Sequence, residues 1–123
     1  MLEMTDGRVP AFAESFLGLR HGPMCALRES SLLVGFLSSN EPARSFERDL
    51  LAELADKKIE PRTVLVGREG DVQVDVDDDD APLLDVVVAQ VLGLVRSVSL
   101  GLSPDAPSAT GVITRVVRSF EIH

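Results

Sequence analysis

Two short apolar runs most constrain what this chain can fold into. Residues 31–37 (SLLVGFL) and 62–66 (RTVLV) are rich in large aliphatic side chains. Strands that are buried on both faces of a parallel sheet have such continuous runs. In strands that are buried on one face only, apolar and polar residues alternate. The segment between them carries apolar residues at helical spacing, namely Phe46, Leu50, Leu51 and Leu54. A strand, a helix and a strand in this order predict a right-handed parallel crossover.

Further patterns extend this α/β unit. Residues 72–76 predict a third strand at a sheet edge, and residues 83–102 predict a long apolar helix. Asn40 is the expected N-cap of the helix that follows the first strand, and that helix is expected to end near Lys57 and Lys58. Helices alternating with parallel strands predict a three-layer α/β/α sandwich.

The apolar run of residues 83–102 is long enough to raise the question of a membrane span. Asp85, Gln90 and Arg96 interrupt it, and neither flank looks like an interfacial anchor. A helix that is apolar on most faces is typical of one buried between a sheet and a neighbouring subunit or domain. We therefore expect a buried helix and no membrane partner.

The charge balance excludes a nucleic-acid binder. Twelve Lys and Arg residues stand against 20 Asp and Glu residues, which gives a net charge of −8. A chain that binds nucleic acid needs a basic stripe to neutralise phosphates. Part of the acidity is one run of aspartates that lacks the offsets, the glycine and the closing glutamate of a Ca²⁺ loop. It is expected to be a solvated turn: Asp75, Asp77, Asp78, Asp79 and Asp80.

Cysteine and histidine are too scarce for a structural zinc site. The single cysteine, Cys25, is expected to be a buried or half-buried thiol and cannot form an intramolecular disulfide. A lone thiol suits a reducing compartment, and the first residues lack the basic and then apolar pattern of a signal peptide. These features predict a cytoplasmic protein.

An acid and a histidine, Glu14 and His21, lie seven residues apart just before the Gly22-Pro23 break. On a helix, this spacing of two turns would bring both side chains to one face. The break would leave the imidazole at an exposed helix end, which suits proton transfer. Surface glutamates and histidines are also ordinary, so a purely structural role stays open.

The sequence around this pair resembles that of a known family. Residues 16–23 (FLGLRHGP) are similar to the second sugar-isomerase (SIS) domain of the tagatose-6-phosphate ketose/aldose isomerase family, which is also called galactosamine-6-phosphate deaminase/isomerase. Residues 2–7 resemble the strand and turn before that helix. Residues 46–54 resemble the helix after the next strand, and residues 101–117 resemble the closing sequence of the family. The resemblance implies a SIS-type, flavodoxin-like parallel sheet.

The length of 123 residues matches only the C-terminal part of the second SIS domain. We therefore expect an incomplete sheet, a partial SIS domain in residues 1–102, and an extended tail in residues 103–123. The segment Ser38-Ser39-Asn40 either caps a helix or holds an anion. The resemblance implies a fragment or a truncated gene product, whose partners would be a missing N-terminal SIS half or further copies in a homo-oligomer.

The resemblance also implies the chemistry. A sugar-phosphate isomerase or deaminase opens the sugar ring and moves a proton through an enediol, without metal or organic cofactor. The match to the family's HGP motif assigns ring opening to His21. Glu3 aligns best with the carboxylate base, with Glu14 second, and Arg20 and Arg115 are the cations assigned to the anionic substrate.

Two alternatives stay open at the level of the sequence. One is a non-catalytic SIS-type module that binds sugar phosphates and regulates transcription or an attached enzyme. The SIS regulators usually carry a basic DNA-binding domain, and the chain shows nothing of that kind. The other alternative is an inactive remnant of an enzyme.

Overall fold

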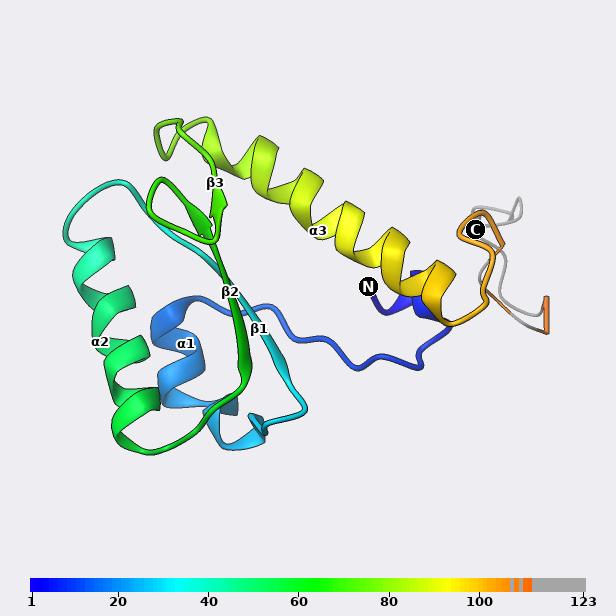
Figure 1. Cartoon of the computed structure of the whole chain (residues 1–123), viewed down its shortest axis with the longest axis horizontal. Coiled ribbons are helices and arrows are strands. Elements are labelled where there is room, and N and C mark those ends of the chain that lie inside the picture. The colour runs from blue at the N-terminus through cyan, green and yellow to red at the C-terminus, as the bar shows by residue number, and fades with distance from the viewer. Residues whose placement is uncertain (107, 109, 112–123) are drawn as a thin grey trace, which may run out of the picture. The chain divides into compact units, whose positions relative to one another are not determined.

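The predicted crossover is present. In the computed structural model, which describes residues 1–106, 108, 110 and 111, strands β1 (Leu32–Phe36) and β2 (Arg62–Gly67) pair in parallel. Their register runs from Leu32 opposite Arg62 to Phe36 opposite Val66. A short third strand, β3 (Val72–Gln73), pairs in parallel with β2, so the order β1-β2-β3 leaves it at an edge, as expected (Figure 1).

The chain divides into two compact units. One unit is Ala13–Val86, which contains the sheet, and the other joins Met1–Phe12 to the described residues from Val87 onward. The division falls within the long helix.

Helix α2 (Ala43–Asp56) supplies much of the core of the sheet-containing unit. Leu50 is fully buried, Leu54 is 4% exposed, and Val66 of β2 is fully buried. Spacings of three and four residues place such side chains on one helix face, as the sequence predicted. Helix α1 packs beside α2, and both lie on the same side of the sheet in Figure 1.

The two ends of α2 are set by different interactions. Asn40 does not cap the helix as expected, because Pro42 is the N-cap residue and the Glu41 carboxylate accepts hydrogen bonds from Ser45 N (3.1 Å) and Ser45 Oγ (2.7 Å). At the other end Lys58 turns left-handed, and Ile59 N donates to the Leu54 carbonyl at 2.9 Å. This turn stops the helix where the sequence predicted.

Helix α1 is shorter than expected and covers only Phe16–His21. Ser15 is its N-cap, with extended backbone angles and an Oγ that accepts a hydrogen bond from Gly18 N at 2.9 Å. Glu14 precedes this cap, so the expectation that Glu14 and His21 share one helix face is wrong. A local side-chain cap decided the helix start, because it satisfies an amide that would otherwise lack a partner.

Gly35 allows α1 to approach the sheet closely. A Cβ at this position would lie 3.1 Å from Cζ of Phe16 and 3.0 Å from Cδ2 of Leu65. Gly35 is itself buried. The Phe16 ring therefore rests on the glycine of β1.

Replacing Gly35 with alanine is expected to lower the free energy of unfolding by about 1–3 kcal/mol, the usual cost of overpacking. Urea denaturation of the variant measures this loss. In a Phe16→Leu background the added methyl group meets a smaller side chain, so the loss should shrink. An equal loss in both backgrounds would contradict the contact between Gly35 and Phe16.

The N-terminal segment forms a 3₁₀ turn, η1 (Glu3–Thr5), in place of the expected strand. The hydroxyl of buried Thr5 donates to the Met1 carbonyl at 3.0 Å, and Asp6 and Gly7 both have positive φ. A side-chain bond to the local backbone of this kind competes with a strand. Residues 2–7 were expected to form a strand and a turn, and the expectation of the strand is therefore wrong.

Helix α3 (Ala81–Ser99) matches the predicted long apolar helix, but it is not buried within the chain. By length and composition alone it could cross a membrane, and among the described residues it is the only helix of that kind. A buried core helix passes the same test, because periodicity shows how apolar a helix is and not what covers it. The large apolar side chains that α3 exposes are Leu83, Leu84, Val86, Val87, Val91, Leu94, Val95 and Val98.

Candidate functional site

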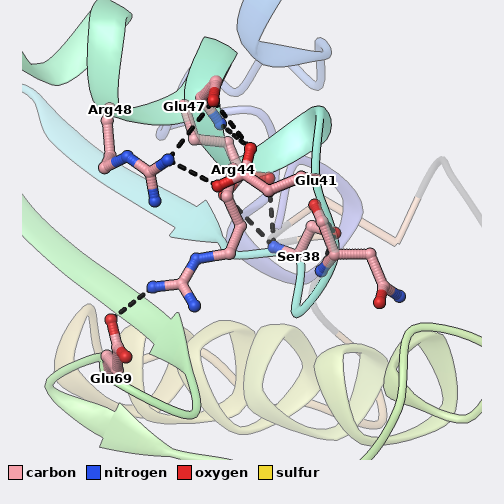
Figure 2. Close-up of polar contacts among 8 residues, drawn as sticks. Ser38, Glu41, Arg44, Glu47, Arg48 and Glu69 are labelled. Atoms are coloured by element: carbon pink, nitrogen blue, oxygen red, sulfur yellow. Dashed lines mark hydrogen bonds and ion pairs between the residues drawn. The ribbon is translucent and has the colours of Figure 1, made fainter.

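The loop after β1 gathers several polar groups at the carboxyl end of the strand. Ligands of parallel α/β sheets bind outside this edge. Ser38 N donates to both carboxylate oxygens of Glu47, at 3.0 and 3.2 Å, as Figure 2 shows. Glu47 is only 7% exposed, and burial raises the pKa of its carboxyl group. A buried carboxylate thus anchors the start of the loop to α2.

A second carboxylate, Asp78, holds the same loop from the other side. It accepts hydrogen bonds from Ser39 N at 2.6 Å, from Ser39 Oγ at 2.7 Å, and from Ser38 Oγ. These donors, Ser38 Oγ first, hold the pKa of Asp78 well below its usual range. The serines therefore neither cap α2 nor face solvent unpaired: carboxylates of the chain itself engage them.

The acidic run is thus not only a solvated turn. Asp78 holds the serine loop, and Arg68 binds Asp75 at 2.9 Å and Asp77 at 2.8 Å. The carboxylate of Asp71, an exposed residue, accepts a hydrogen bond from Leu65 N at 2.8 Å. Strand β3 has two residues, against the five expected.

Replacing Asp78 with asparagine is expected to destabilise the protein at neutral pH and to matter less in acid. The folded-state pKa of Asp78 is lowered, so its contribution is present above the unfolded-state value of about 3.9 and is lost as pH falls below it. Urea midpoints measured from pH 7 down to pH 2.5 should converge for the two proteins. Asp79→Asn, in an exposed position of the same run, is the control. A constant difference at every pH would contradict the role of the charge.

Cations at this edge of the sheet are paired with acids. Figure 2 shows Arg44 bound to Glu69, and Arg48 to Glu41 at 2.5 Å. Arg68 is paired with Asp75 and Asp77 as well, so acidic side chains offset the positive charge of all three arginines at this edge. Exposed pairs of this kind contribute little to stability.

Glu14 lies at the start of α1 and lines a cavity of about 310 Å³. Its Oε2 occupies the space over Gly18, 2.7 Å from where a Cβ would be. The cavity is open to solvent and mostly apolar, and its lining residues are Glu14, Ser15, Phe16, Leu17, Val34, Phe36, Ala43, Phe46 and Glu47.

His21 is the last residue of α1 and is exposed. Gly22 and the 3₁₀ turn η2 (Pro23–Ala26) follow it, so the Gly-Pro break ends the helix as predicted. Glu14 and His21 therefore lie at opposite ends of α1. The ring is free to meet a molecule from outside the helix.

Arg20, expected to contact substrate, forms an ion pair with α2. Its Nε lies 2.6 Å from Oε2 of Glu53, and the other carboxylate oxygen of Glu53 binds Lys57. Lys57 and Arg20 lower the pKa of Glu53. The pair joins the end of α1 to α2.

The other expected site residues lie outside this region. Glu3 is the first residue of η1, in the unit that contains Met1–Phe12, and it is exposed. Arg115 lies outside the described residues, as does most of the expected tail of residues 103–123.

The sequence analysis missed three carboxylates that hold the site together: Glu47, Glu53 and Asp78. Glu47 could have been found, because it precedes Leu50 and Leu54 by three and seven residues and so shares their buried face. The ion pair of Glu53 with Arg20 and the bonds of Asp78 to the serines carry no such signal, since these partners lie far away in sequence.

Metal binding finds no support in the described part of the chain, where no group of three or more His, Cys, Asp or Glu residues is placed to hold an ion. Cys25 is exposed, so the expectation of a buried or half-buried thiol is wrong. Its position in η2, beyond the Gly-Pro break, leaves it on the surface.

The parallel sheet with its flanking helices matches the SIS-type isomerase fold, with an incomplete sheet. The crystal structure of tagatose-6-phosphate ketose/aldose isomerase from Escherichia coli superposes with a TM-score of 0.74 at 28% identity. The match covers 96% of this chain and 34% of that one. No family profile matches the chain.

The chain is homologous over its whole length to a curated sugar-phosphate enzyme. It is 33% identical to D-galactosamine-6-phosphate deaminase AgaS of Escherichia coli, over 100% of this chain and 35% of that protein. AgaS of Shewanella sp. (strain ANA-3) is 30% identical over 99% of this chain and 32% of its own length. The chain therefore spans about a third of the length of the curated relatives that it matches, which is consistent with a partial SIS domain.

Proposed function

We propose that this chain is part of a sugar-phosphate isomerase or deaminase that acts on a hexose- or hexosamine-6-phosphate. The observation that carries the proposal is the homology of the whole of this chain to part of AgaS, which includes the segment with His21. In this proposal residues 1–102 are the C-terminal portion of a SIS domain and residues 103–123 are a tail. The remainder of the domain comes from sequence that this chain does not contain.

The proposed chemistry is proton transfer. An exposed imidazole at a helix end, as in His21, can donate a proton to the ring oxygen and accept one from the hydroxyl, which opens the sugar ring. A carboxylate then takes the proton from C2 to form the enediol, and we assign this role to Glu3, with Glu14 second. Arg20 and Arg115 are the proposed contacts of the substrate anion. No metal or organic cofactor is required for these steps.

A hybrid enzyme tests this function. The chain replaces the corresponding third of Escherichia coli AgaS, and isomerisation and ammonia release are assayed with galactosamine-6-phosphate and tagatose-6-phosphate. The chain alone is assayed in parallel. We expect turnover in the hybrid and none in the chain alone. A hybrid that binds the sugars without turnover would favour the regulatory module, and a folded hybrid that does neither would contradict both.

We further propose that the protein is cytoplasmic and that α3 is covered by another subunit or domain. The eight large apolar side chains that α3 exposes support this covering, because exposed apolar patches of this kind mark interaction sites. Light scattering after gel filtration measures the oligomeric state. A stable monomer of the hybrid would contradict a homo-oligomer.

A further inference from the structure

Helix α1 is too short to hold its own shape. It has six residues, and isolated helices of fewer than about 12 residues are marginal in water. The position of His21, its last residue, therefore depends on contacts between α1 and its neighbours.

Two contacts anchor this helix, one at each end. At the first turn, the Phe16 ring lies over Gly35 of β1. At the last turn, Arg20 Nε lies 2.6 Å from Glu53 Oε2 of α2. The second contact involves the residue that directly precedes His21.

Glu53 is well placed to serve as a fixed point. Its side chain is 20% exposed and that of Arg20 is 35% exposed, so water reaches the pair only in part. Leu50 and Leu54, on either side of Glu53 in sequence, are in the core and keep α2 in place. Lys57 binds the second carboxylate oxygen.

We propose that Glu53 is a positioning residue for the proton transfer assigned to His21. It acts through Arg20: the ion pair fixes the last turn of α1 and thereby the direction in which the imidazole projects. The inference rests on the proposed function, and it gives Arg20 a role in holding the helix beside its proposed contact with the substrate. Small misplacements of a catalytic group lower the rate strongly, because the reaction requires a narrow geometry.

The test compares Glu53→Gln with Lys57→Gln in the hybrid enzyme. Glutamine keeps the size of the side chain and removes the charge that binds Arg20. We expect Glu53→Gln to lower kcat by about 10–100-fold with little change in KM. Lys57→Gln removes the other cation from the same carboxylate without touching α1, so its kcat should stay within about twofold of the parent. Equal losses in both variants, or a loss confined to KM or to thermal stability, would overturn the proposal.

A second measurement does not need turnover. Backbone ¹⁵N relaxation of the unmodified chain and of both variants reports the order of the Arg20 and His21 amides. We expect their order parameters to fall in Glu53→Gln and to stay unchanged in Lys57→Gln. An inert hybrid would count against the proposed function alone, whereas unchanged order parameters in Glu53→Gln would overturn the positioning role in either case.

Discussion

Replacing His21 with alanine is expected to lower the turnover of the hybrid enzyme by about 10²–10⁴-fold, the usual contribution of a general acid–base group. The imidazole is exposed at the end of α1, so its loss leaves no cavity, and the fold should be retained. Initial rates of ketose formation from the aldose phosphate measure the effect. Thermal unfolding of the same preparation should show a change of at most a few degrees.

Two controls separate the role of His21 from general damage. The matched variant is His123→Ala, which removes the other histidine of the chain and should leave the rate unchanged. Hydrogen exchange from solvent into C2 of the sugar isolates the carbon proton step from ring opening. If His21 opens the ring, an open-chain substrate analogue should exchange at a similar rate with the parent and with His21→Ala. Full turnover by His21→Ala would contradict the proposed role of His21 in ring opening.

The largest expected loss of stability follows from Leu50→Ala, at about 2–5 kcal/mol. Leu50 is fully buried on α2, and the truncation removes apolar contacts and leaves a cavity beside the sheet. Because folded domains are stable by only about 5–15 kcal/mol, such a loss unfolds a substantial fraction of the molecules. Urea denaturation followed by circular dichroism gives the change in the free energy of unfolding.

Leu83→Ala is the matched control for this prediction. It deletes the same atoms from a side chain that is 74% exposed, so the unfolding free energy should change by no more than about 0.5 kcal/mol. Equal losses in the two variants would show that Leu50 is not the core residue that the structure describes.

The sheet and α2 were predictable because their signals are local. A continuous apolar run identifies a strand buried on both faces, and helical spacing identifies the buried face of α2. Strands β1 and β2 differ from the predicted runs by at most one residue at each end, 32–36 against 31–37 and 62–67 against 62–66. Two strands joined by one helix then leave little choice but a parallel crossover.

The details of the candidate site were less predictable, because they depend on side-chain hydrogen bonds and on distant partners. The hydroxyl of Ser15 moved the start of α1 beyond Glu14, and a helix pattern does not reveal which residue caps it. Asp78 looked like one member of an acidic run, yet it binds serines about 39 positions earlier. The ion pair of Arg20 with a carboxylate on α2 likewise joins two segments that are distant in sequence.

The sequence by itself determined the α/β class, the positions of β1 and β2, the long apolar helix and the Gly-Pro break after His21. Each of these follows from residue spacing and backbone preference within one segment. Only the tertiary structure decided which carboxylates hold the serine loop, what binds Arg20, and that α3 exposes its apolar side chains. The reason is physical: periodicity records which face of an element avoids water, while hydrogen bonds and ion pairs depend on which distant segments the fold brings within about 3 Å.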